Sequence, residues 1–325
     1  MVVHSWGFAC VALFQSWAAA PALPADGDAA RPSLWVDVYQ GEPVTYEALL
    51  DDLAASTVIY LGERHTVQRH HDLETKLVVD LGAKGLPLVV GLEQLDTSAQ
   101  PALDKFNRQE IDFDKLAELT DWAKQWRNYQ QYRPTIEAAR KAGATVIALN
   151  AKSEVIRQIA RGGGVEKLPA DMRKELPADM QLQDPAYEKL LGLSLMVHMA
   201  ATPERMRPMI EAQIARDETM AATLAAYLNS AAGRKRTAVV ICGAGHVNYG
   251  LATAGRVHQR IPGVRDRIVI FSESGDVKLS PEEMKMAREV EITHEQLREI
   301  NRPIADYLSV VSLAPDRAET KPAGP

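Results

Sequence analysis

The feature that most constrains the fold of this chain is a series of short, almost wholly apolar runs rich in β-branched residues. They occur at residues 57–61, 88–92, 145–149, 238–242 and 268–271. Continuous apolar runs of this length are typical of strands that are buried on both faces. Segments with helical spacing separate them, as where Leu73, Leu77 and Leu81 recur among charged residues. This alternation predicts an α/β fold with a mostly parallel central sheet flanked by helices.

The interval from residue 151 to residue 235 carries no strand signal. Its spacing instead predicts several helices, notably at 186–199 and 203–229. We interpret the interval as a helical insertion or lid over the sheet.

The C-terminal part adds a few further elements. A Ser-Pro-Glu-Glu sequence that begins at Ser280 predicts another helix, and residues 305–313 predict a final edge strand. We expect one domain over residues 35–315, with the helical insertion at about 151–235, and a disordered tail at 316–325.

The N-terminal segment differs from the rest of the chain. An apolar run from Trp6 to Phe14 is followed by alanines and then by polar residues, which is the order of a secretory signal peptide that ends near Ala22. No lysine or arginine precedes the run, so a buried N-terminal helix is the alternative. A membrane anchor would need about 20 apolar residues. Cys10 lies in a poor match to a lipoprotein box, which leaves lipidation open.

The charge balance excludes nucleic acid as a partner. The chain has 37 Lys and Arg against 43 Asp and Glu, a formal net charge of −6. Domains that bind nucleic acid usually present a basic stripe to the phosphates.

Two of the predicted strands end in the same sequence motif, in which a glycine is followed by any two residues and then by a histidine. These turns are Gly62-Glu63-Arg64-His65 and Gly243-Ala244-Gly245-His246. We expect the glycines to permit a sharp turn, and ligands of parallel sheets usually bind at the carboxyl ends of the strands. A single histidine after a strand is more often a structural hydrogen-bond partner, but two on one sheet favour a functional site.

Glu93 follows a third strand. A buried carboxylate is costly unless it meets a metal ion, a histidine or an arginine, and a salt bridge to Arg64 is the structural alternative. His65, His246 and Glu93 together would suit a divalent metal ion with an open coordination position.

Other polar and aromatic residues are candidates for supporting roles. His71 and Glu74 share a face of the helix that follows the first turn, either as support for the site or as a solvated helix start. Gln213 and Asp217 lie four residues apart and either reach the site or form an exposed polar stripe.

An aromatic stretch at 122–134 could line a flat hydrophobic ligand or simply pack beneath a lid. Tyr132 within it is of interest because phenolate is a hard ligand that favours ferric iron.

Several of these motifs follow one another in an order that resembles the ChaN family of iron-regulated, haem-binding bacterial lipoproteins, which is related to the Tiki and TraB proteins. They are Val58 to His65 with His70-His71, Gly91 to Gln94, Trp126 with Tyr132-Arg133-Pro134, Ile147 to Asn150, Gln213 with Asp217 and Met220-Ala221, and Gly243 to Val247. The turn Arg64-His65-Thr66 departs from the more acidic or amide-rich sequence expected there.

The resemblance implies haem as the ligand, and a homodimer and an outer-membrane haem receptor as partners. It also implies export to the periplasm, with attachment to the outer membrane left open. Tyr132 is the favoured iron ligand and Tyr249 the reserve, with His71 and Trp126 as further haem contacts.

Relatives in the Tiki group are metal-dependent proteases, and their resemblance supports a second hypothesis. In a metal-dependent hydrolase, His65, His246 and Glu93 would hold the ion, and Glu63 would take a proton from the metal-bound water. A third interpretation is an interaction domain that keeps this frame only as structure.

Overall fold

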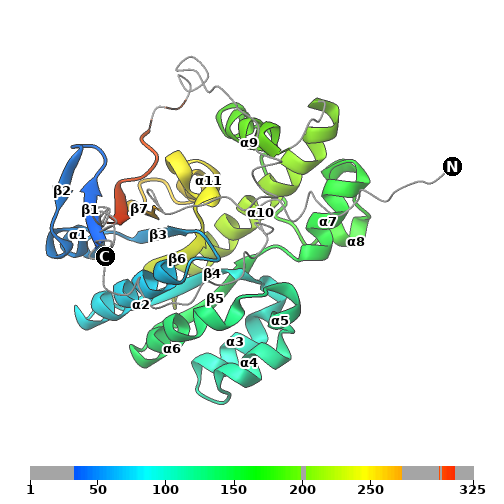
Figure 1. Ribbon diagram of the computed structural model, residues 1–325. Helices are drawn as coiled ribbons and strands as arrows, with labels where there is room; N and C mark the ends of the chain where they lie inside the picture. Colours follow the sequence, from blue (N-terminus) through cyan, green and yellow to red (C-terminus); the bar gives the residue numbers. More distant parts are fainter. Residues whose placement is uncertain (1–32, 199–202, 273–299, 301, 312–325) are drawn as a thin grey trace, which may run out of the picture.

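The fold is organised around one eight-stranded sheet with the order β2-β1-β8-β7-β3-β6-β4-β5 (Figure 1). The computed structural model describes residues 33–198, 203–272, 300 and 302–311. The strands are β1 (Ser33–Asp37), β2 (Glu42–Val44), β3 (Val58–Glu63), β4 (Leu88–Asp96), β5 (Thr145–Asn150), β6 (Thr237–Gly243), β7 (Asp266–Phe271) and β8 (Tyr307–Val311).

All five apolar runs form strands, and neighbouring strands from β8 to β5 run parallel. At the other end of the sheet, β1 pairs antiparallel with both β8 and β2. The predicted α/β fold with a mostly parallel, helix-flanked sheet is therefore confirmed.

The helices connect the strands and cover both faces of the sheet. They are α1 (Tyr46–Ala54), α2 (Gln68–Ala83), α3 (Gln100–Asn107), α4 (Phe113–Leu119), α5 (Trp122–Gln125), α6 (Arg133–Lys141), α7 (Ser153–Gly162), α8 (Ala170–Arg173), α9 (Pro185–His198), α10 (Pro203–Asn229) and α11 (Ala252–Arg260). Short 3-10 turns lie at η1 (Thr97–Ala99), η2 (Tyr129–Tyr132), η3 (Val165–Lys167), η4 (Ala244–His246) and η5 (Asn248–Gly250).

Alternation along each strand divides the core into two layers. Ile59 and Leu61 of β3 pack in a cluster with α1 to α6, whereas Val58 and Tyr60 pack in a second cluster with α10 and α11 on the opposite face. Because successive side chains of a strand point to opposite faces, the fully apolar runs are those that have helices on both sides.

The long helix α10 is part of the core of the domain, whereas an insertion or lid over the sheet was predicted. The predicted helices at 186–199 and 203–229 correspond to α9 and α10. Met220, Leu224 and Leu228 in the second half of α10 belong to the core layer beneath the sheet. Its first half packs with α7 and α9 in smaller clusters beside the carboxyl ends of the strands.

The strand predicted at 305–313 is not at the edge of the sheet. It forms β8, which lies between β7 and β1. The unpredicted strand β1 covers it, with Val36 opposite Leu308, and Trp35 of β1 packs edge-on against Phe271 at 6.5 Å between ring centroids.

The signal peptide at 1–22, the helix at Ser280 and the tail at 316–325 lie outside the described residues. Among the helices that the structure describes, none combines the length and the apolar character needed to cross a bilayer.

Candidate functional site

The two glycine–histidine turns lie side by side at the carboxyl ends of β3 and β6. These strands are parallel neighbours, with Gly62 opposite Cys242 and Glu63 opposite Gly243. The sheet therefore brings together two motifs that are far apart in the sequence, as predicted.

The glycines serve close packing and do not adopt the backbone conformation reserved for glycine. Gly243 has a φ of −58°, and neither turn glycine has a positive φ. A Cβ atom on Gly62 would lie 3.2 Å from Ala244 Cα, and one on Gly243 would lie 2.9 Å from His65 Nε2. Each glycine thus leaves room for the other turn. Close packing, and not the backbone freedom that we expected a sharp turn to need, accounts for glycine at these two positions.

Glu93 lies between the two histidines. Its Oε1 is 3.2 Å from His246 Nε2 and 4.0 Å from His65 Nε2, and its Oε2 accepts a 2.7 Å hydrogen bond from the Gly243 backbone N–H. Burial opposes the ionisation of Glu93, but His246, His65 and this N–H outweigh it and lower its pKa. The partner of the buried carboxylate is a pair of histidines.

A second carboxylate supports each histidine from behind. His65 Nδ1 lies 2.9 Å from Glu63 Oε1, and His246 Nδ1 lies 2.7 Å from Asp217 Oδ1. Both histidines therefore direct Nε2 toward Glu93 while Nδ1 is held by a carboxylate. This is the usual arrangement of histidines that ligate metal ions.

Asp217 reaches the site from α10 and is not part of an exposed stripe. It is fully buried, and its carboxylate accepts hydrogen bonds from Tyr187 Oη at 2.7 Å and from Thr253 Oγ1 at 2.8 Å. Gln213, one turn earlier, contacts His246 Nδ1 at 3.1 Å. Burial disfavours the charged form of His246, yet Glu93 and Asp217 raise its pKa to about 10.

Glu63 positions several other side chains through its Oε1. Besides His65, its Oε1 accepts hydrogen bonds from Tyr132 Oη at 2.7 Å and from Gln94 Nε2 at 2.9 Å. Despite burial, the contacts with His65, His71 and Tyr132 lower the pKa of Glu63. Glu63 orients His65 in this arrangement, which does not favour the predicted role as proton acceptor for a metal-bound water.

Behind Glu63 lies a second buried cluster of possible metal ligands. Glu63, His71 and Glu74 each offer a ligand atom within 4.8 Å of the others. Burial and the neighbouring Glu63 raise the pKa of Glu74 well above its usual range. The sequence suggested His71 and Glu74 only as support or as a solvated helix start, and their complete burial excludes the solvated alternative.

Three of the residues proposed to contact haem lie inside the protein. Tyr132 is fully buried, and burial followed by the charges of Glu63 and Glu74 raises its phenol pKa. His71 Nε2 contacts the His65 backbone carbonyl at 3.0 Å. Trp126 is 6% exposed and packs edge-on against His65, with ring centroids 4.8 Å apart. The phenol of Tyr132 cannot reach a surface ligand in this arrangement.

Tyr249, the reserve candidate, has a different environment. It is only partly buried and lies in η5, three residues after His246, with a left-handed backbone (φ 62°, ψ 15°). Gly250 and Ala252 also have positive φ values of 64° and 51°. The Arg302 guanidinium covers Gly250, because a Cβ atom there would lie 2.5 Å from Arg302 Cζ. The turn after His246 is thus strained, and its Tyr249 is partly exposed.

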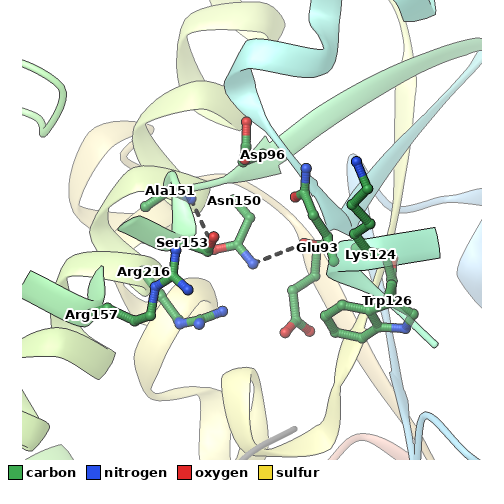
Figure 2. A pocket seen from close by; sticks show the side chains of 11 residues that line it. Glu93, Asp96, Lys124, Trp126, Asn150, Ala151, Ser153, Arg157 and Arg216 are labelled. Carbon is green, nitrogen blue, oxygen red and sulfur yellow. Dashed lines mark hydrogen bonds between the residues drawn. The ribbon is translucent and has the colours of Figure 1, made fainter. Parts of the chain in front are cut away.

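A pocket of about 370 Å³ opens beside Glu93, between the ends of β4 and β5 and helices α5, α7 and α10 (Figure 2). Glu93, Trp126, Asn150, Arg157 and Arg216 contribute to its wall. Asn150 is fixed there, since its amide donates to the Glu93 carbonyl at 2.9 Å and its side-chain oxygen accepts from the Ala151 N–H at 2.8 Å. No motif in the sequence predicts this pocket.

A sequence profile described as haem-binding uptake, Tiki superfamily, ChaN matches residues 49–257. The chain belongs to this ChaN-type family. The predicted membership is therefore confirmed. The matched range includes both glycine–histidine turns and the α10 residues that support them. A comparison with curated proteins found no match.

Solved structures show the same fold. The chain is similar to the ChaN of Campylobacter jejuni, described as binding haem cofacially, with 17% sequence identity, a TM-score of 0.64, and coverage of 86% of this chain and 97% of that one. Weaker likenesses include the erythromycin esterase EreC (12% identity, TM-score 0.42, 70% and 72% covered). Another is the toxin effector domain RRSP of Vibrio vulnificus (17% identity, TM-score 0.38, 74% and 38% covered).

Proposed function

We propose that this protein binds haem and assists haem or iron uptake, with Tyr249 as the iron ligand. The family to which the chain belongs and the likeness to a haem-binding ChaN support haem as the ligand. The observation that selects the residue is the contrast between Tyr132, which is fully buried, and Tyr249, which is partly exposed on a strained turn.

The residues around Tyr249 suit a haem. A phenol can supply the oxygen ligand that ferric haem takes from tyrosine in other proteins. The left-handed backbone limits the directions in which the Tyr249 side chain can point. Arg302, beside Gly250, offers a guanidinium to a propionate carboxylate. When bound, the haem would supply the iron, and this chain would supply the ligand and the counter-charge.

A hemin titration of the full chain tests this proposal. We expect wild-type protein to give an absorbance spectrum with the charge-transfer band of a tyrosinate-ligated ferric haem, and Tyr249→Phe to lose that band. Tyr39→Phe is the matched control, because Tyr39 is 62% exposed in the turn between β1 and β2, away from the site. A free-hemin spectrum from the wild-type protein would refute the proposal.

A metal-dependent hydrolase is the second candidate, and it rests on one observation. Two histidines direct Nε2 toward Glu93 Oε1 while carboxylates hold both Nδ1 atoms. With Glu63 engaged, water activation would depend on the pKa-lowering effect of the ion. Metal analysis of protein purified without chelators should then find a stoichiometric divalent ion that is lost in His65→Ala and His246→Ala.

The control for the metal analysis is His258→Ala, since His258 pairs with Asp266 at 2.9 Å, away from the site. Absence of metal from the wild-type protein would remove this candidate. Retention of metal in His246→Ala would remove His246 from the proposed ligands.

Export to the periplasm, a homodimer and an outer-membrane haem receptor are part of the haem proposal. Cell fractionation of the full-length chain tests export. Analytical ultracentrifugation with and without hemin tests the dimer, which should form or tighten when hemin is added. Co-purification from outer membranes, with Tyr249→Phe as the comparison, tests the receptor.

A further inference from the structure

Arg216 is buried at the wall of the pocket without a protein partner. Only 6% of its surface is exposed, and Figure 2 shows its guanidinium directed into the pocket. Among the residues that the structure describes, none hydrogen-bonds to this guanidinium or forms an ion pair with it. Burial lowers the pKa of Arg216, and the attraction of Glu93 and Asp217 offsets this only in part. A buried cation in such a position is costly unless an anion meets it.

The acidic residues of the pocket do not fill this role, because each already has partners. Glu93 is held by the Gly243 N–H and by His246. Asp96 accepts a 2.9 Å hydrogen bond from the Ser98 N–H at the start of η1. The positive charge of Arg216 is therefore directed toward the pocket itself.

Other groups on the same wall favour an anion. Arg157 of α7 lines the pocket together with Arg216 (Figure 2). Ser153, also in the wall, is the first residue of the ten-residue helix α7, which no side chain caps. The N–H groups and the positive end of the helix dipole therefore face the same space.

We propose that this pocket binds a small organic oxyanion, a carboxylate or a phosphate ester, between Arg216 and Arg157. The remainder of the molecule would lie against Trp126 and beside Glu93, close to the two histidines. A volume of about 370 Å³ is in the range of small-ligand sites, which is roughly 300–1,000 Å³. The pocket is a site in addition to the haem-binding turn at Tyr249, and it stands whether or not haem binds there.

Calorimetric titration of the full chain with benzoate and with inorganic phosphate tests the proposal. Tighter binding of benzoate would identify an aromatic carboxylate that uses Trp126, and tighter binding of phosphate would identify a phosphate ester. Arg216→Met should weaken the better probe by about tenfold or more, because a hydrogen bond to a charged group is lost. Arg157→Gln should also weaken it, whereas Arg161→Gln on the same helix, outside the pocket wall, should not.

Thermal unfolding separates a binding role of Arg216 from a structural one. Replacing a buried, unpaired cation by an apolar side chain of similar length should keep or raise the melting temperature. The proposal is overturned if neither probe binds the wild-type protein, or if Arg216→Met binds the better probe as tightly as wild type does. If Arg216→Met fails to fold, the proposal is overturned when Arg157→Gln binds the better probe as tightly as wild type does. Displacement of the probe by hemin would assign the pocket to haem and would also overturn it.

Discussion

The two glycine–histidine turns have the same sequence pattern but lead into different surroundings. After His65 the chain enters α2, where His71 and Glu74 are buried behind Glu63. After His246 it enters a turn in which Tyr249 and Ala252 have left-handed backbones, and Tyr249 is partly exposed while Ala252 is buried. The tyrosine near the first turn, Tyr132, is buried, whereas the tyrosine after the second turn, Tyr249, is partly exposed. This difference is the basis for proposing Tyr249, after the second turn, as the iron ligand.

The carboxylates that hold the Nδ1 atoms of the two histidines, Glu63 and Asp217, also have different surroundings. Glu63 belongs to its own turn and has as a neighbour Glu74, whose pKa is raised by burial and by Glu63. Asp217 instead comes from α10, the helix that packs on the sheet. Loss of Glu63 can be compensated locally, but loss of Asp217 removes the carboxylate partner of His246 Nδ1 and of the Tyr187 hydroxyl.

The largest expected effect is that of Asp217→Asn on stability. Breaking a buried charge pair costs about 3–5 kcal/mol of unfolding free energy, and we expect Asp217→Asn to lie near the lower end of this range. Glu63→Gln should cost less, because Glu74 can then ionise and pair with His71 at 3.3 Å. Urea unfolding of both variants measures the difference, and a larger loss in Glu63→Gln would contradict the asymmetry.

The second prediction concerns pH. The folded-state pKa of His246, about 10, lies above its ordinary value of 6.5. Its contribution to the stability of the metal-free protein is therefore fully present below about pH 6.5 and is lost as the pH rises toward 10. The unfolding free energy of chelator-treated protein should fall across this window, and the fall should be smaller in Asp217→Asn. Equal slopes for the two proteins would exclude Asp217 as a cause.

The third prediction compares the two turn glycines. In Gly62→Ala the new Cβ meets the Ala244 backbone at 3.2 Å, so stability should fall by about 1–3 kcal/mol. In Gly243→Ala the contact is with the His65 side chain and not with backbone, so stability should change less. Metal affinity, if the site binds a metal, should then fall more in Gly243→Ala. Thermal melts and metal titrations of the two variants distinguish these outcomes, and the reverse order of stabilities would be inconsistent with the contacts.

The smallest effect is expected at Ala252, whose φ is 51°. Ala252→Gly removes the steric cost of a left-handed alanine and should raise the unfolding free energy by about 0.5–1 kcal/mol. The same change loosens the turn beside Tyr249 and should weaken hemin binding slightly. A lowered melting temperature would show that the turn is not strained.

The sequence predicts the parallel part of the sheet well because five long apolar runs mark it. It does not reveal β1, whose short Ser33–Asp37 run carries a weaker signal, and so the place of β8 was predicted wrongly as an edge. The convergence of His65, His246 and Glu93 follows from strand ends alone, which the sequence shows.

Burial of single side chains depends on tertiary packing, which local patterns do not contain. Tyr132 and Tyr249 both follow polar residues in the sequence, yet only Tyr249 is partly exposed. The Asn-Tyr-Gly sequence at 248–250 is the available signal for a left-handed turn. The spacing of Gln213 and Asp217 hinted at one helix face but not at what that face contacts.

The most direct test of the central claim is resonance Raman spectroscopy of the hemin complexes of Tyr249→Phe and Tyr132→Phe. We predict iron–phenolate vibrations in wild-type protein and in Tyr132→Phe, and their loss in Tyr249→Phe. Tyr132→Phe should be less stable, because Glu63 loses a hydrogen-bond donor, but its haem spectrum should be unchanged. Persistence of the phenolate signal in Tyr249→Phe, with its loss in Tyr132→Phe, would contradict the account.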